Sequence, residues 1–284
     1  MSQPTIANTI AELRALTAGW RKAGDTIGLV PTMGALHEGH VSLTRLMREK
    51  ARRTIVSIFV NPTQFGPNED FTRYPRTFQA DCEKLAAAGV DAVFAPAPDE
   101  VYPDGFCTTI SLAGPATAGL EDAFRPTHFA GVATVVTKLF TMVAPDAAIF
   151  GEKDFQQLAV IRRMARDLNL PVEILGAPTM READGLAMSS RNVYLSPAER
   201  QAAPALNRAM RAAATVIRSG TAIAPALVEA RAAIAAAGFV IDYLEVRDAG
   251  SLAPVEKPEE RALRMLAAAR LGKTRLIDNI SLDD

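Results

Sequence analysis

The strongest constraint on the fold is a regular alternation of short apolar runs and longer amphipathic segments between residues 26 and 175. Short β-branched or apolar runs predict buried strands, and apolar residues at helical spacing predict helices. Strands that alternate with helices form a parallel sheet that helices cover on both faces. The predicted strands are 26–30, 54–60, 91–95, 147–150 and 172–175. A first predicted helix begins at Thr9, and the others span 40–53, 77–88, 129–143 and 155–168.

The pattern changes near Pro178. Ser196 to Glu199 combines a capping box with a proline at the first helical position, so a helix should begin there. Alanine-rich helices are predicted to about Ser219 and again over 224–237. Three later runs, 241–246, 262–269 and 274–280, predict a smaller antiparallel sheet. We therefore expect two domains, residues 1–178 and residues 179–284.

Charge and cysteine content exclude several classes of protein. The 284 residues carry a formal net charge of −1, which argues against a general nucleic-acid binder, since such proteins have a basic excess. Cys82 and Cys107 have no framework spacing, as in a reduced compartment, and are expected to be small buried hydrophobes. The chain has no signal-peptide pattern at its start and no apolar stretch of about 18 residues. We therefore expect a cytoplasmic protein without membrane contact.

The segment Pro31–His40 lies between a predicted strand and a predicted helix. Gly34 and Gly39 allow a ligand close to the backbone, and the helix N-terminus favours a phosphate. His37 and His40 can donate hydrogen bonds to phosphate oxygens. One alternative is that both histidines are ordinary polar loop residues. Another is a zinc site, although no Cys/His cluster provides the third and fourth ligands that zinc requires.

Two further segments carry candidate phosphate-binding residues. In 150–157, Lys153 is a mobile point charge suited to phosphate, whereas Asp154 is expected either to cap the following helix or to face the ligand. In 188–192, two hydroxyls and Arg191 can hold a polyphosphate, or the segment is simply a polar linker.

Other polar residues could bind a small substrate. Asn61 and Gln64 follow the predicted strand 54–60, and Gln157 lies one turn into a predicted helix. Arg125 could bind a carboxylate or phosphate, while His128 is expected to cap or to pack.

Five motifs together resemble the pantothenate synthetase family: PTMGALHEGH, NPTQF with YPR, RPTHFAGV, FGEKDFQQ and MSSRN, in that order. His37-Glu-Gly-His40 resembles the HIGH motif of nucleotidylyltransferases, and MSSRN resembles their KMSKS-like partner motif. The resemblance implies an α/β fold, with a Rossmann-like parallel sheet in the N-terminal domain and a smaller α+β C-terminal lid domain. It also implies an ATP-dependent condensation of (R)-pantoate with beta-alanine through a pantoyl adenylate, which yields pantothenate, AMP and pyrophosphate. Mg²⁺ with ATP and a homodimer are further implied.

The resemblance also implies roles for individual residues. His37, His40, Lys153, Ser189, Ser190 and Arg191 would be catalytic, because they can donate to the charge that develops on the phosphates; His40 would be the general acid. Gln64 and Gln157 would bind substrate. Asp81 matches an acidic position near the family's magnesium site, although its neighbour Ala80 is not acidic. The residues that would contact ATP are Met33, Gly34, Ala35, Leu36, His37, Glu38, Gly39, His40, Gly151, Glu152, Lys153, Asp154, Met180, Met188, Ser189, Ser190 and Arg191.

Two rival functions remain open on the sequence. A nucleotidylyltransferase would transfer the nucleotide and stop, so it would lack an amine-dependent second step. A nucleotide-binding regulator would hold ATP without turnover, so it would release no pyrophosphate in response to pantoate.

Overall fold

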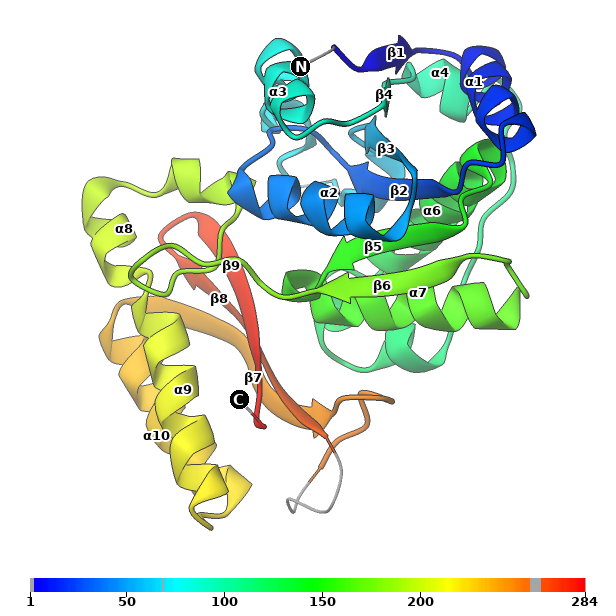
Figure 1. The fold of residues 1–284 in the computed structure, drawn as a ribbon. Helices are drawn as coiled ribbons and strands as arrows, with labels where there is room; N and C mark the ends of the chain where they lie inside the picture. The colour runs from blue at the N-terminus through cyan, green and yellow to red at the C-terminus, as the bar shows by residue number, and fades with distance from the viewer. Residues whose placement is uncertain (1–2, 68, 256–261, 284) are drawn as a thin grey trace.

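The structure is a computed structural model that describes residues 3–67, 69–255 and 262–283. Its N-terminal part is built on a parallel sheet with the strand order β1-β4-β3-β2-β5-β6 (Figure 1). The predicted parallel sheet is confirmed. Strand β1 was not predicted, because its three residues are too few to establish a period. The strands are β1 (Thr5–Ala7), β2 (Ile27–Thr32), β3 (Arg53–Ile58), β4 (Ala92–Phe94), β5 (Ala147–Gly151) and β6 (Glu173–Ala177).

Helices cover both faces of this sheet. On one face, α1, α6 and α7 share a buried core with the strands, and on the other face α2 and α3 do so. Helix α6 is apolar almost all round because it lies between the sheet and the loop that contains residues 62–64. The helices are α1 (Ile10–Lys22), α2 (Glu38–Lys50), α3 (Phe78–Ala87), α4 (Pro98–Val101), α5 (Glu121–Phe124), α6 (His128–Val143) and α7 (Phe155–Asp167).

The order in which the chain adds strands to the sheet reverses between β2 and β5, although all the strands stay parallel. From β2 the chain adds β3 and then β4 on one side, whereas β5 pairs with the opposite edge of β2 and is followed by β6. Loops that leave the carboxyl ends of two such strands diverge and open a crevice, which is where ligands bind in open α/β sheets. The Pro31–His40 and Phe150–Gln157 segments leave these two strand ends.

The C-terminal part has the predicted antiparallel sheet, with order β7-β8-β9, and helices packed against it (Figure 1). The capping box at Ser196 is confirmed. The alanine-rich segments are helices because their small side chains pack into a continuous core. The elements are α8 (Pro197–Ala202), α9 (Ala205–Arg218), α10 (Ile223–Ala236), β7 (Phe239–Asp248), β8 (Leu263–Leu271) and β9 (Thr274–Ser281).

The two parts meet through a buried contact. Leu120 and Phe155 pack against Tyr243 and Leu266 of the C-terminal sheet. Beside them Glu121, 8% exposed, accepts hydrogen bonds from Tyr243 and from both terminal nitrogens of Arg275, each at 2.8 Å. The predicted fold class is thus confirmed, whereas the division into residues 1–178 and 179–284 stays a prediction.

Candidate active site

Asp81 holds the loop between β2 and α2 in shape. Its carboxylate accepts hydrogen bonds from the backbone N–H groups of Ala35 (2.9 Å) and Leu36 (2.8 Å), and from the hydroxyl of Thr77 (3.1 Å). Both Gly34 and Ala35 have positive φ, a conformation that is costly for alanine. Asp81 is fully buried. A magnesium ion coordinated by Asp81, as the sequence suggests, would have to displace these hydrogen bonds.

His37 and His40 are held by the backbone at the start of α2, which begins at Glu38 rather than at His40. The Nδ1 atom of His37 accepts from Gly39 N–H at 3.1 Å, and the Nδ1 atom of His40 accepts from His37 N–H at 3.3 Å. Because each Nδ1 is an acceptor, each neutral ring carries its proton on Nε2. Burial, and then the charges of nearby cations, lower the pKa of His37 to about 4; burial and then His37 lower the pKa of His40 to about 3. Both side chains are therefore neutral donors near pH 7 in the substrate-free protein.

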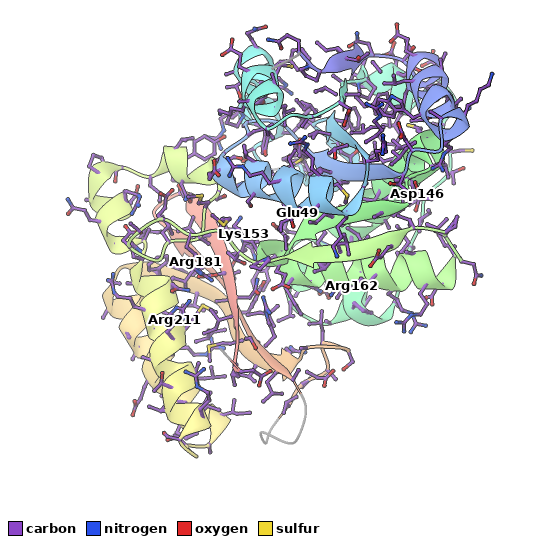
Figure 2. The ribbon with its side chains drawn as sticks, viewed as in Figure 1. Glu49, Asp146, Lys153, Arg162, Arg181 and Arg211 are labelled. Atoms are coloured by element: carbon purple, nitrogen blue, oxygen red, sulfur yellow. The ribbon has the colours of Figure 1, made fainter. Side chains whose placement is uncertain are left out.

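Lys153 lies in a short turn that follows β5, η4 (Glu152–Asp154). Figure 2 places it where the two parts of the chain meet. Within the ranges that the structure describes, its ammonium group has no hydrogen-bond or ion-pair partner. The expected side-chain cap at Asp154 is wrong: Asp154 makes no capping hydrogen bond to α7, and its exposed carboxylate lies at the cavity.

The segment Met188–Arg191 brings residues of the second predicted domain onto the first. Ser189 caps η5 (Ser190–Tyr194), and the hydroxyl of Ser190 donates to the carbonyl of Ala35 at 3.2 Å. Arg191 donates two hydrogen bonds to Asp70. Met180 lies nearby, and its carbonyl accepts from Met188 N–H at 3.0 Å. The polar segment is thus more than a linker, because it already contacts the loop of Ala35.

Gln64 ends η1 (Pro62–Gln64), and its side chain is oriented by Asn61. The amide nitrogen of Asn61 donates to Gln64 Oε1 at 3.1 Å, so the Gln64 –NH₂ group is directed elsewhere and contacts Met33 Sδ at 3.2 Å. Asn61, 1% exposed, is fixed in turn by the Tyr102 hydroxyl at 2.8 Å. Gln64 therefore presents hydrogen-bond donors to the cavity.

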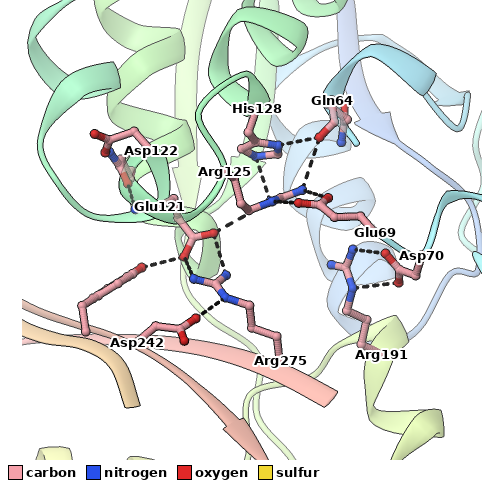
Figure 3. Close-up of polar contacts among 12 residues, drawn as sticks. Gln64, Glu69, Asp70, Glu121, Asp122, Arg125, His128, Arg191, Asp242 and Arg275 are labelled. Atoms are coloured by element: carbon pink, nitrogen blue, oxygen red, sulfur yellow. Dashed lines mark hydrogen bonds and ion pairs between the residues drawn. The ribbon is translucent and has the colours of Figure 1, made fainter. Parts of the chain in front are cut away.

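Arg125 and His128 form a polar group behind Gln64 (Figure 3). Arg125 pairs with Glu69 through two hydrogen bonds of 2.7 Å. His128 Nδ1 lies 3.0 Å from the carbonyl of Gln64, and its Nε2 lies 3.2 Å from Arg125, so the neutral ring donates from Nδ1 and accepts at Nε2. Burial and the Arg125 charge lower the pKa of His128 to about 4. This buried histidine supports the backbone of Gln64.

These groups surround a cavity of about 230 Å³, which opens into a larger cleft of about 550 Å³ between the two parts. One wall is apolar and comes largely from α6, with Val132, Val136 and Leu139. Helix α6 can pack closely against η1 because Gly131 lacks a side chain. A Cβ atom there would lie 2.3 Å from the carbonyl oxygen of Thr63. The predicted residues that line the cavity are Met33, His37, Gly39, His40, Gln64, Gly151, Lys153, Asp154, Gln157, Met180, Met188, Ser189, Ser190 and Arg191.

The other predicted site residues do not line this cavity. Glu38 pairs with Arg45, and Glu152 pairs with Arg264 at 2.9 Å. Gly34, Ala35 and Leu36 form the loop that Asp81 holds.

Sequence patterns alone did not single out Asn61, Arg125 and His128 as a supporting layer. Their signal in the sequence was position, since Asn61 follows a strand end, Arg125 precedes α6 and His128 begins it.

Two features that the described ranges lack bear on the zinc alternative and on the expectation of no membrane contact. Within these ranges, no group of three or more His, Cys, Asp or Glu side chains could hold a metal ion, so no third protein ligand accompanies His37 and His40. In the same ranges, no helix has the length and apolar character needed to cross a membrane.

Comparisons with known proteins point to one family. The model of the pantoate-beta-alanine ligase family matches residues 5–281. The chain is 60% identical to pantothenate synthetase 2 of Bradyrhizobium diazoefficiens over 98% of its own length and 99% of that protein. It is 56% identical to a pantothenate synthetase of Rhodopseudomonas palustris, with the same coverage.

Solved structures agree with these sequence comparisons. A pantothenate synthetase from Thermus thermophilus superposes with a TM-score of 0.92 and 47% identity, over 98% of this chain and 99% of that one. A pantoate-beta-alanine ligase from Francisella tularensis, complexed with beta-gamma ATP and beta-alanine, has a TM-score of 0.84 and 34% identity, over 99% of this chain and 98% of that one.

Proposed function

We propose, from the premise that this chain belongs to the pantoate–beta-alanine ligase family, that it joins pantoate to beta-alanine at the expense of ATP. In the first step a carboxylate oxygen of pantoate attacks the α-phosphorus of ATP, and the bond to pyrophosphate breaks. In the second step the amine of beta-alanine attacks the acyl carbon, the bond to AMP breaks, and the amine loses a proton. The products are pantothenate, AMP and pyrophosphate.

The observation that carries this proposal is the convergence of phosphate donors on one cavity. It is bordered by the neutral Nε2–H groups of His37 and His40, by the ammonium group of Lys153, which no described residue pairs with, and by the Ser189–Arg191 segment. Preorganised donors of this kind stabilise the charge that develops when pyrophosphate leaves. We propose that the bound triphosphate raises the pKa of His40, because its negative charge opposes the effect of burial. His40 then becomes a better proton donor, as its predicted role of general acid requires.

The substrate acid fits the other side of the cavity. The branched carbon of pantoate would pack on the apolar wall of α6. Its hydroxyls and carboxylate would accept hydrogen bonds from the –NH₂ groups of Gln64 and Gln157. Asn61 strengthens this assignment, because it turns the Gln64 amide so that donors face the acid.

Contacts with ATP divide into side-chain and backbone contacts. Glu38 and Glu152 are paired with arginines, so we propose that their part of the ATP site is formed by backbone groups, together with Gly34, Ala35, Leu36, Gly39 and Gly151. Met180 and Met188 would border the adenine.

We propose that Mg²⁺ enters as part of the ATP substrate. The ion offsets phosphate charge and holds the triphosphate in one conformation. Asp154 has an exposed carboxylate at the cavity and fits such an ion. Asp81 is the residue that the family resemblance suggests, but its oxygens already accept backbone N–H groups; a role in shaping the loop suits it better.

The setting of the enzyme follows from the same premise. We propose a homodimer in the bacterial cytoplasm, where Cys82 and Cys107 stay reduced; both are free thiols in the structure. Cys107 is exposed, contrary to the expectation that both cysteines are buried. Sedimentation velocity of the purified chain tests the dimer.

One assay tests the chemistry. Positional isotope exchange in ATP should occur with pantoate alone, because the adenylating groups do not require the amine. AMP should accumulate catalytically only when pantoate and beta-alanine are both present. Turnover without an amine would favour the nucleotidylyltransferase alternative, and ATP binding without any pantoate-dependent pyrophosphate would favour the regulator.

A further inference from the structure

Asn279 of β9 reaches from the C-terminal sheet to the turn that carries Lys153. Its side-chain –NH₂ group donates to the carbonyl oxygens of Glu152 and Lys153, both at 2.8 Å. These two carbonyls belong to consecutive residues of η4. One amide group with two hydrogen bonds to adjacent peptide units fixes both the place and the direction of the turn.

Asn279 is itself rigidly held. It is 2% exposed, and its Oδ1 atom accepts from Arg264 Nε at 2.7 Å. The same guanidinium donates to the Glu152 carboxylate at 2.9 Å and lies 4.3 Å from the centroid of the Phe155 ring. Together, Arg264 and Asn279 therefore hold the turn through its two backbone carbonyls and through the Glu152 carboxylate. Because the –NH₂ group of Asn279 donates twice and its Oδ1 atom accepts, the amide has a single favourable orientation.

Lys153 depends on this turn more than a paired lysine would. Among the described residues, none forms a hydrogen bond or an ion pair with its ammonium group, so no side-chain contact steers it. The position of its backbone therefore sets where the charge can reach. Gly151, which precedes the turn, has no atom within 4 Å of the place where a Cβ would be, so packing at this point does not fix the turn.

We infer that Asn279 is a positioning residue for Lys153: through it the C-terminal domain sets the place of the phosphate-binding lysine. The inference rests on the proposed function, since it assumes that Lys153 acts on the phosphates. Displacing a catalytic group by about 1 Å costs on the order of a hundredfold in rate. Loss of the Asn279 amide therefore reduces turnover without removing any group that touches substrate.

The experiment combines Asn279→Ala and Lys153→Ala with a matched control. Asn207→Ala is the control, because Asn207 is a buried asparagine of the same domain, 4% exposed, that pairs with Asp278 and Arg211 and not with the turn. Two readouts are needed: pantoate-dependent pyrophosphate release, and hydrogen–deuterium exchange of the peptide that covers residues 150–158. Thermal unfolding verifies that each variant is folded at the assay temperature.

The expected result has three parts. Asn279→Ala lowers kcat by about tenfold to a hundredfold and speeds exchange in the 150–158 peptide, whereas Asn207→Ala does neither. Lys153→Ala lowers kcat by at least about a hundredfold. In the Lys153→Ala background, Asn279→Ala causes little further loss, since the group that it positions is already absent.

Unchanged exchange in Asn279→Ala, or rate losses that multiply in the double variant, would overturn the positioning role. Full activity of Lys153→Ala would instead refute the role of Lys153 in the proposed function. In that case faster exchange in Asn279→Ala would still establish that Asn279 holds the turn, but the link to catalysis would be wrong. If Asn279→Ala does not fold, Asn279→Leu provides the same comparison, because it keeps about the same side-chain size and removes the donors without burying a charge.

Discussion

The carboxylate of Asp70 accepts two hydrogen bonds from the guanidinium of Arg191, at 2.9 and 3.0 Å. Burial alone would raise the pKa of Asp70, but the Arg191 charge outweighs burial and holds the pKa below its ordinary value. In the substrate-free protein, the carboxylate of Asp70 is thus bound to Arg191, the residue that we assign to the triphosphate. We predict that ATP replaces Asp70 as the partner of Arg191.

Asp70→Asn should therefore tighten ATP binding. An ion pair that is partly exposed is worth up to about 1 kcal/mol, so the dissociation constant should fall by up to about fivefold. Titration calorimetry with a non-hydrolysable ATP analogue measures this change. Asp184→Asn is the control, since Asp184 also pairs with an arginine, Arg200, but lines neither the cavity nor the larger cleft that Asp70 borders. Weaker binding by Asp70→Asn would mean that Asp70 supports the site instead of competing for it.

Replacing Arg191 should have the opposite effect on binding and should also slow the reaction. Arg191→Ala should weaken ATP binding and lower kcat by about a hundredfold to a thousandfold. Arg191→Lys should recover only part of this loss, because a point charge cannot reproduce a planar, two-pronged contact. Steady-state kinetics with varied ATP provide the test.

The same variant tests whether the C-terminal domain closes like a lid. A non-hydrolysable adenylate analogue should reduce the radius of gyration of the wild-type protein in small-angle scattering, and should reduce it less in Arg191→Ala. Equal compaction of both proteins, or none in the wild type, would assign the junction a passive role.

His128 should make stability depend on pH. Its pKa is about 4 in the folded protein, below the value of 6.5 expected for the unfolded chain. Between these values the unfolded chain binds a proton that the folded protein does not, so the free energy of unfolding falls as pH drops from about 7 toward 4. His128→Asn keeps a donor toward the Gln64 carbonyl but does not titrate.

Urea unfolding of both proteins measures the difference. Between about pH 7 and about pH 5, the wild type should lose about 1–2 kcal/mol more than His128→Asn. Equal losses would mean that His128 does not resist protonation in the folded state.

Gly131 should tolerate no side chain, because its would-be Cβ collides with the Thr63 carbonyl. Gly131→Ala should push α6 away from η1, destabilise the protein by about 1–3 kcal/mol, and raise the KM for pantoate because Gln64 moves. Gly19→Ala is the control: Gly19 lies in α1 with nothing within 4 Å, so that change should stabilise by about 0.5–1 kcal/mol. Denaturation and steady-state kinetics report both effects. A harmless Gly131→Ala would show that α6 can shift without cost.

The sequence by itself determined the kinds of element and much of their order. Short continuous apolar runs indicate buried strands, and a period of 3.6 residues indicates amphipathic helices; both are local properties that tertiary context did not override here. The capping box at Ser196 and the loop at Pro31–His40 could be found for the same reason. The carboxyl ends of parallel strands share one edge of a sheet, so the sequence also predicts a ligand site at the ends of the strands that became β2 and β5.

Only the tertiary structure decided which polar groups face one another. Asn279 and Lys153, or Arg191 and Asp70, are far apart in sequence, and no local pattern indicates that they are partners. The protonation states of His37 and His40 were equally hidden, because they follow from burial and from backbone donors that exist only after the loop has folded. Asp154 illustrates the same limit: its position suits a helix cap, yet its carboxylate lies free at the cavity. Hydrogen bonds and pKa values depend on distances between segments that are far apart in sequence, and a local residue pattern does not specify those distances.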